Sequence, residues 1–259
     1  MPNWERQAES HIDRQIYIKL FCFVFGVGIW EYITAFGYEW AVYSGRRKYL
    51  RTIWLYSGFR FLLLMWLFTL LVSKNGAVHH HCTTMYIATS FTCYVIVSLG
   101  SLMIALRVIA IWEHKRLISL LSYGFIILCF VVNMRSLFYL RARYDPVSRS
   151  CVAFGSYNHL PCTIAILATD MALMAMMLLG LLRLWEARQL GLVRFLYRQG
   201  VLWLALAMIA GHPTVVAAGL GVTKDIYLTA QVFATTALCI CATRMYRGLT
   251  DYVHVPERC

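Results

Sequence analysis

The sequence lacks the motifs on which many soluble enzymes are built. It contains no glycine-rich phosphate loop, no HExxH helix, no GxSxG turn and no DDxxD cluster for a magnesium-bound diphosphate. Its last hydrophobic stretch has no central lysine, so a retinal Schiff base is not expected. We therefore predict no cofactor and no metal, and any chemistry has to come from side chains inside hydrophobic segments.

Charge is also scarce. Charged residues form 14% of the 259-residue chain and hydrophobic residues 60%, a balance that a soluble domain cannot bury. A membrane-spanning helix takes about 20 residues. The sequence predicts an all-α polytopic membrane protein, a bundle of seven transmembrane helices. The predicted spans are 16–38, 53–73, 84–106, 117–138, 163–185, 201–220 and 227–246.

These spans leave no room for a separate soluble domain. We predict an outer N-terminal segment at 1–15, the seven-helix domain at 16–246 and a short cytoplasmic tail at 247–259. Residues 1–15 mix acidic and basic side chains, and this composition is not that of a cleaved signal peptide. The first span is therefore expected to be retained.

The basic residues predict the orientation. With the N-terminus outside, inner loops and span ends hold 14 Lys and Arg and the outer ones hold 9. The positive-inside rule favours an outer N-terminus and a cytoplasmic C-terminus, in the plasma membrane or the endoplasmic reticulum. The net charge of +12 is spread over several loops. Membrane lipids, and not nucleic acid, are the expected partners of this charge.

Three charged residues, Glu31, Arg60 and Asp170, fall well inside the spans. Each costs roughly 2.5 to 3.5 kcal/mol on insertion scales unless it is compensated. Counted from the ends of the first two spans, Glu31 and Arg60 are level, so we predict a structural ion pair between them. Glu39 lies at the rim, where we expect it to pair with basic loop residues and to carry no chemistry.

Asp170 has no base within a turn on its own helix. Its candidate partners on other spans are His212, Arg60, Ser90, Ser98 and Ser101. Asp170 is then either the polar floor of a ligand pocket, a proton donor, or a hydrogen-bonded clasp between helices. His212 precedes Pro213, which bends a helix. The candidate ligand-binding residues are Asp170, His212, Arg60 and Met174.

Cysteines and histidines gather on the predicted outer face. Three consecutive histidines at 79–81 cannot all bind one ion, and no paired CxxC or HxxxH spacing supports a metal site. The outer compartment is oxidising, so a disulfide is expected instead. Cys82 is predicted to pair with Cys151 or Cys162, leaving the third cysteine free.

Several short motifs follow one another along the chain: Trp30-Glu31, Glu39, the basic stretch 45–48, Arg60-Phe61, the segment 106–112 (Leu-Arg-Val-Ile-Ala-Ile-Trp), Asp170, Gly200, and Arg244 with Arg247. Together they resemble the fungal, chiefly basidiomycete, seven-transmembrane proteins of unknown function. Gln199 and His212 depart from the family pattern, which usually has Asp and Asn there. The resemblance covers about residues 16 to 250 and implies the seven-span fold, with no established activity.

Two classes of function remain open. One is a receptor-like sensor that binds a small lipophilic ligand in the bundle and meets a cytoplasmic protein through Arg107 and its basic inner loops. The other is a membrane cyclase or isomerase acting on a terpenoid-type substrate, with Asp170 or Glu31 as the acid. A transporter ranks third, because no inverted repeat is evident. We favour the sensor, since Arg60 is expected to neutralise Glu31.

Overall fold

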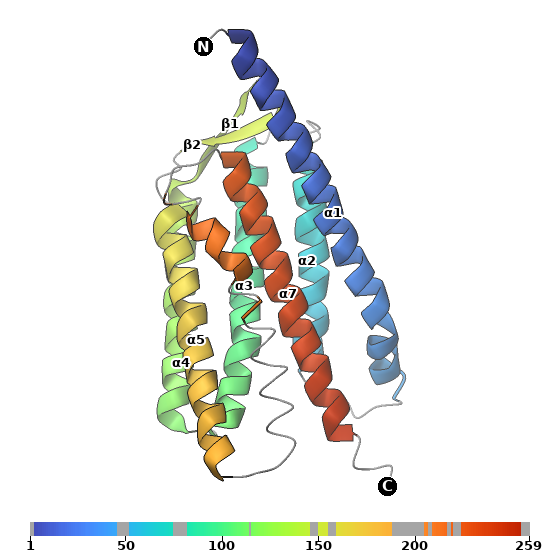
Figure 1. Cartoon of the computed structure of the whole chain (residues 1–259), viewed down its shortest axis with the longest axis vertical. Helices are drawn as coiled ribbons and strands as arrows, with labels where there is room; N and C mark the ends of the chain where they lie inside the picture. The colour runs from blue at the N-terminus through green and yellow to red at the C-terminus, as the bar shows by residue number, and fades with distance from the viewer. Residues whose placement is uncertain are drawn as a thin grey trace.

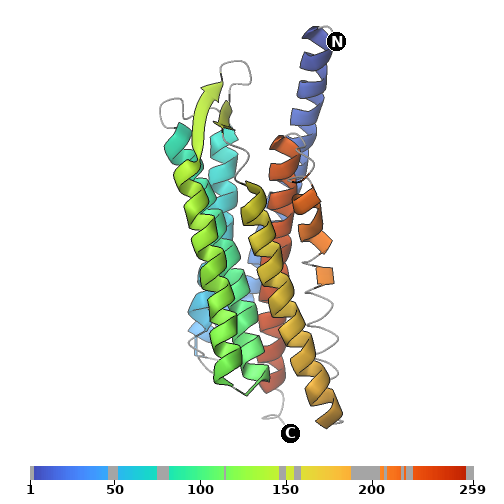
Figure 2. The same ribbon diagram turned by 90° about the vertical axis from the view of Figure 1, so that its left-hand side faces the viewer.

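The computed structural model describes residues 3–45, 52–74, 82–113, 115–145, 150–154, 159–187, 205–206, 209–216, 219 and 224–254. Within these ranges the chain forms long helices and one small hairpin, side by side along one axis (Figures 1 and 2). The helices are α1 (Asn3–Tyr43), α2 (Ile53–Lys74), α3 (Cys82–Ile111), α4 (Arg116–Tyr139), α5 (His159–Ala187) and α7 (Lys224–His254).

Six described helices are long and apolar enough to cross a membrane. They contain six of the seven predicted spans, and most differ from the prediction by a few residues at each end. The first and last helices extend further: α1 begins at Asn3 and ends at Tyr43, and α7 continues to His254. Much of the predicted span 201–220 lies outside the described residues, although 209–216 are helical.

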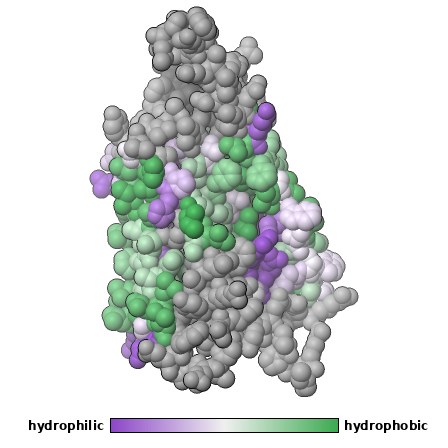
Figure 3. All heavy atoms as spheres, viewed as in Figure 1, coloured by the Kyte–Doolittle hydropathy of each residue, from purple (hydrophilic) through white to green (hydrophobic). Residues whose placement is uncertain are grey.

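The side chains that face outward are those of a lipid-facing surface. Trp30, Leu120 and Phe138 are 66%, 74% and 79% exposed, and large hydrophobic residues are exposed on every long helix except α7. Hydrophobic atoms cover much of the described surface in Figure 3. Water would penalise such an exterior heavily, whereas hydrocarbon does not. The protein is therefore a helical bundle built for a membrane.

The core of the bundle has two parts that share α3 and α7. The first joins α1, α2, α3 and α7 around fully buried Tyr56, Phe59 and Leu67. The second joins α3, α5 and α7 around Leu173 and Met177, with α4 packed outside. α3 and α7 thus connect the two halves of the molecule.

α3 and α5 approach closely at the end of the bundle where α3 finishes. The indole Nε1 of Trp112 donates to the Met176 carbonyl over 3.0 Å, and Arg183 lies 5.8 Å from the Trp112 ring. A Cβ at Gly180 would lie only 2.7 Å from Ile111 and from Trp112. Glycine at this position therefore lets the two helices touch.

The segment between α4 and α5, which the sequence analysis treated as a loop, contains an antiparallel hairpin. Strand β1 (Arg141–Asp145) pairs with β2 (Ser150–Phe154), with Arg143 opposite Val152. The hairpin packs against α3 at the end of the bundle near the N-terminus (Figure 1). Only five residues per strand are involved, too few for the hydropathy pattern to reveal beside long apolar helices.

α5 and α7 run in the same direction. In Figures 1 and 2 both start at the end that carries the hairpin and finish at the opposite end. The chain between Ala187 and Lys224 therefore connects opposite ends of the bundle. The N- and C-termini also lie at opposite ends (Figure 1).

Candidate functional site: a charged cluster and a pocket at Asp170

Arg60 lies at the centre of a charged cluster formed by Glu31, Glu39, Arg60, Arg244 and Arg247. It is buried on α2 and forms an ion pair with the carboxylate of Glu39 on α1. Its Nη2 donates to the Glu31 backbone carbonyl over 2.7 Å. The guanidinium also lies 4.8 Å from the Tyr32 ring. Arg60 is therefore satisfied on several sides by α1.

Glu31 is held by α7. Its carboxylate pairs with Arg244, and Nη2 of Arg247 lies 3.3 Å from its Oε2. The two arginines are three residues apart, so they lie on one face of the helix. Both arginines are named in the family resemblance but are not paired there with Glu31, although their spacing at the end of an apolar span was a usable signal.

The predicted ion pair between Glu31 and Arg60 is therefore wrong in its partners. The depth estimate took Tyr38 as the end of the first span, but α1 continues to Tyr43. Five more residues add about 7.5 Å, which places Glu31 deeper and brings Glu39 within reach of Arg60. The expectation that Glu39 pairs with loop bases in water is also wrong, since Glu39 is only 4% exposed.

The ion pairs of the charged cluster hold helices together. Two carboxylates face three guanidinium groups, and they join α1 to α2 and to α7. Below it, Tyr56 stacks on Tyr246 with ring centroids 5.1 Å apart, and the Tyr246 hydroxyl lies 2.9 Å from that of Thr52. Each of the two carboxylates is paired with at least one arginine, and neither glutamate lines the pocket described below.

Asp170 lies in a different environment. It is on α5, and its Oδ1 accepts a hydrogen bond from the Ser101 hydroxyl of α3 over 2.9 Å. Ser101 is one of the partners that the sequence analysis predicted for Asp170, and the structure confirms this contact. Asp170 also lines a pocket with about 600 Å³ of empty space, part of it open to the surroundings.

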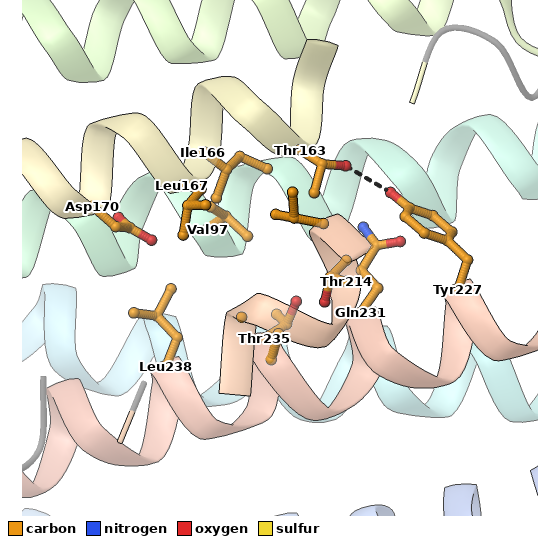
Figure 4. A pocket seen from close by; sticks show the side chains of 13 residues that line it. Val97, Thr163, Ile166, Leu167, Asp170, Thr214, Tyr227, Gln231, Thr235 and Leu238 are labelled. Atoms are coloured by element: carbon orange, nitrogen blue, oxygen red, sulfur yellow. Dashed lines mark hydrogen bonds between the residues drawn. The ribbon is translucent and has the colours of Figure 1, made fainter. Parts of the chain in front are cut away.

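The pocket lies between α3, α5, α7 and the helical residues 209–216. α5 contributes residues at i, i+3, i+4 and i+7, which form one helical face. Figure 4 shows Asp170 at one end and the hydrogen bond between Thr163 and Tyr227, 3.2 Å long, at the other. The lining residues are Val97, Thr163, Ile166, Leu167, Asp170, Gly211, Thr214, Val215, Tyr227, Gln231, Ala234, Thr235 and Leu238.

Several pocket residues were missed by sequence reasoning. On α7, Tyr227, Gln231 and Thr235 are spaced four residues apart and form a polar stripe along an otherwise apolar span. That spacing is a helical signal that could have found them. Gln231 Nε2 donates to the Cys93 sulfur over 3.4 Å. The stripe faces the pocket, whose other walls are mainly aliphatic.

The structure separates the four predicted ligand-binding residues. Asp170 lines the pocket, whereas Arg60 belongs to the charged cluster and Met174 packs against the second core. His212 is exposed, and the pocket is lined instead by its neighbours Gly211 and Thr214. The helix turns the His212 side chain outward, away from the pocket.

At the hairpin end, Cys82 is disulfide-bonded. Cys162 is not its partner, since its thiol is free and contacts the Val132 carbonyl. The side chain of Cys151 and the histidines at 79–81 lie outside the described residues. Within the part of the chain that is described, no group of three or more His, Cys, Asp or Glu side chains is arranged to hold a metal ion.

Comparison with family models, curated proteins and solved structures finds no match to this chain. The resemblance to the fungal seven-transmembrane proteins therefore stays a prediction. The site is described by its own geometry: a charged cluster that ties α7 to α1 and α2, and a mostly apolar pocket with one carboxylate between α3, α5 and α7.

Proposed function

We propose that this protein is a receptor-like membrane sensor that binds a small lipophilic ligand in the pocket at Asp170. The observation that carries the proposal is the pocket itself, in which a largely aliphatic wall surrounds one carboxylate and a few neutral polar groups. Such a lining suits a molecule that is apolar over most of its surface and polar at one or two points.

The arrangement of the helices supports a response to the ligand. The pocket touches α3, α5 and α7, and α7 continues from Tyr227 at the pocket to Arg244 and Arg247 in the charged cluster. A ligand that prefers one position of α7 therefore also acts on the contacts with Glu31. The pocket and the cluster are connected by a rigid helix.

The seven-span topology is part of this proposal. It is supported by the parallel course of α5 and α7, because the chain between them has to return along the bundle. The helical residues 209–216 lie on that return path. The outer N-terminus, the cytoplasmic tail, the plasma or reticulum membrane, a cytoplasmic protein partner and the fungal family remain proposals from sequence.

A cyclase or isomerase is the second candidate, and one observation favours it: Asp170 is a carboxyl group inside a largely apolar pocket. Glu31 no longer supports it, since two arginines hold that carboxylate. Only one aromatic residue, Tyr227, lines the described pocket. Carbocation chemistry gains from several aromatic faces, so binding fits the lining better than catalysis.

The test is to purify the full chain in detergent and identify retained lipophilic molecules by mass spectrometry. Asp170→Asn is compared with wild type and with Thr169→Val. Thr169 is the matched control, because its hydroxyl bonds the Ala165 carbonyl of its own helix and does not line the pocket. We expect a molecule retained by wild type and by Thr169→Val, and reduced about tenfold in Asp170→Asn.

Equal retention in Asp170→Asn, or no retained molecule in wild type, would contradict the proposal. The enzyme is tested in the same preparation by supplying a terpenoid. A product that forms with wild type and disappears with Asp170→Asn would favour catalysis over sensing.

A further inference from the structure

Asp170 differs from the other two acids buried in the bundle. Glu39 is paired with Arg60, and Glu31 with Arg244 and Arg247. Asp170 receives one hydrogen bond, from the neutral hydroxyl of Ser101, among the described contacts. Among the described residues, arginine therefore pairs with Glu31 and Glu39, and no cation pairs with Asp170.

The pocket wall does not supply the missing charge. Among the described residues that line it, Asp170 is the single charged side chain, and the others are aliphatic, tyrosine, threonine, glutamine or glycine. A carboxylate in such surroundings is costly unless it meets a cation or takes a proton. One neutral donor offsets only part of that cost.

A second polar group in the pocket also has no partner. The Thr214 hydroxyl is buried and, within the described part of the chain, makes no hydrogen bond. Thr214 is 6% exposed and lines the same pocket from residues 209–216, opposite the α5 face that carries Asp170. A hydroxyl oxygen accepts hydrogen bonds, so Thr214 is a second, neutral polar point in the pocket, away from Asp170 (Figure 4).

We propose that the ligand of this pocket is a lipophilic amine, an ammonium group on a compact apolar body. The ammonium pairs with the Asp170 carboxylate, and the apolar body contacts Ile166, Leu167 and Leu238. This inference rests on the proposed ligand-binding function. It specifies that the ligand is positively charged, whereas the proposed function says only that the ligand is lipophilic.

Three compounds with the same adamantane body and different polar groups test the charge. They are adamantan-1-amine, adamantan-1-ol and adamantane-1-carboxylate, added to the detergent-purified full chain while its thermal unfolding is followed. A ligand that binds the folded state raises Tm, and at a fixed ligand concentration the rise grows with the logarithm of the affinity. We expect the amine to bind about tenfold more tightly than the alcohol, and the carboxylate to leave Tm unchanged.

Two variants locate the effect. In Asp170→Asn the advantage of the amine over the alcohol should disappear, whereas in Thr169→Val it should be kept. If Asp170→Asn does not fold, the order of the three compounds on wild type still decides. Equal affinity for amine and alcohol, a stronger effect of the carboxylate, or an amine advantage that survives in Asp170→Asn would overturn the inference.

The failures of the two proposals are distinguishable. If the alcohol binds and the amine does not, the proposed lipophilic pocket is supported and the inference of an amine ligand is contradicted. Absence of any response to the three compounds, together with no retained molecule in the mass-spectrometric experiment, removes both.

Discussion

Removing Arg60 is expected to cost about 3 to 5 kcal/mol of unfolding free energy, because it leaves the carboxylate of Glu39 buried without its cation. Both side chains are about 5% exposed, so solvent screens their attraction little. Arg60→Met keeps an unbranched apolar side chain while removing the charge and the hydrogen bond to the Glu31 carbonyl. Glu39→Gln removes the opposite charge and keeps the shape.

The assay is equilibrium unfolding in mixed detergent micelles, with both single variants and the double variant. The double variant removes both charges, so no unpaired charge is left in the bundle. Its loss of unfolding free energy should be smaller than the sum of the two single losses by about 1 to 3 kcal/mol. Glu113→Gln is the control, because Glu113 is exposed in the turn after α3. Additive costs, or single variants within about 0.5 kcal/mol of wild type, would refute the buried pair.

Two further predictions concern packing and covalent structure. Gly180→Ala should lower stability by about 1 to 3 kcal/mol in the same assay, since its Cβ would meet Trp112 at 2.7 Å, whereas Gly124→Ala has open space and should be neutral or stabilising. Equal effects of the two substitutions would contradict the close contact. Peptide mapping without reduction should find Cys82 in a disulfide and Cys162 as a thiol; a link between Cys82 and Cys162 would contradict the structure.

Much of the helical architecture could be predicted from the sequence because a membrane helix is encoded locally. A run of about 20 apolar residues is sufficient to predict it, and α2 and α4 begin and end within two residues of their predicted bounds. The hairpin after α4 was missed, since its short strands carry no such run. The end of α1 was placed at Tyr38 and lies at Tyr43, because polar and charged residues near a rim lower the hydropathy while the helix continues.

The partners of the buried charges were harder to predict. A sequence gives the depth of Glu31 along its own helix, but not which neighbouring helix faces it. α7 lies far from α1 in the chain and beside it in space, so Arg244 was not considered as a partner. For Asp170 the right partner, Ser101, was among several that depth alone allowed. The side to which His212 points depends on helix rotation, which hydropathy does not give.

The length of α1 has a consequence for anyone who attaches a probe to this protein. Its 41 residues extend about 60 Å, twice the thickness of the hydrocarbon layer, and its first four turns contain the charged residues Glu5, Arg6, Glu9, Asp13 and Arg14. The first 15 residues of the helix are thus about 22 Å of rod beyond the bilayer. A fluorophore attached to the start of α1 would therefore report a distance from the membrane surface. A second label on the hairpin would give a reference distance at the same end of the bundle.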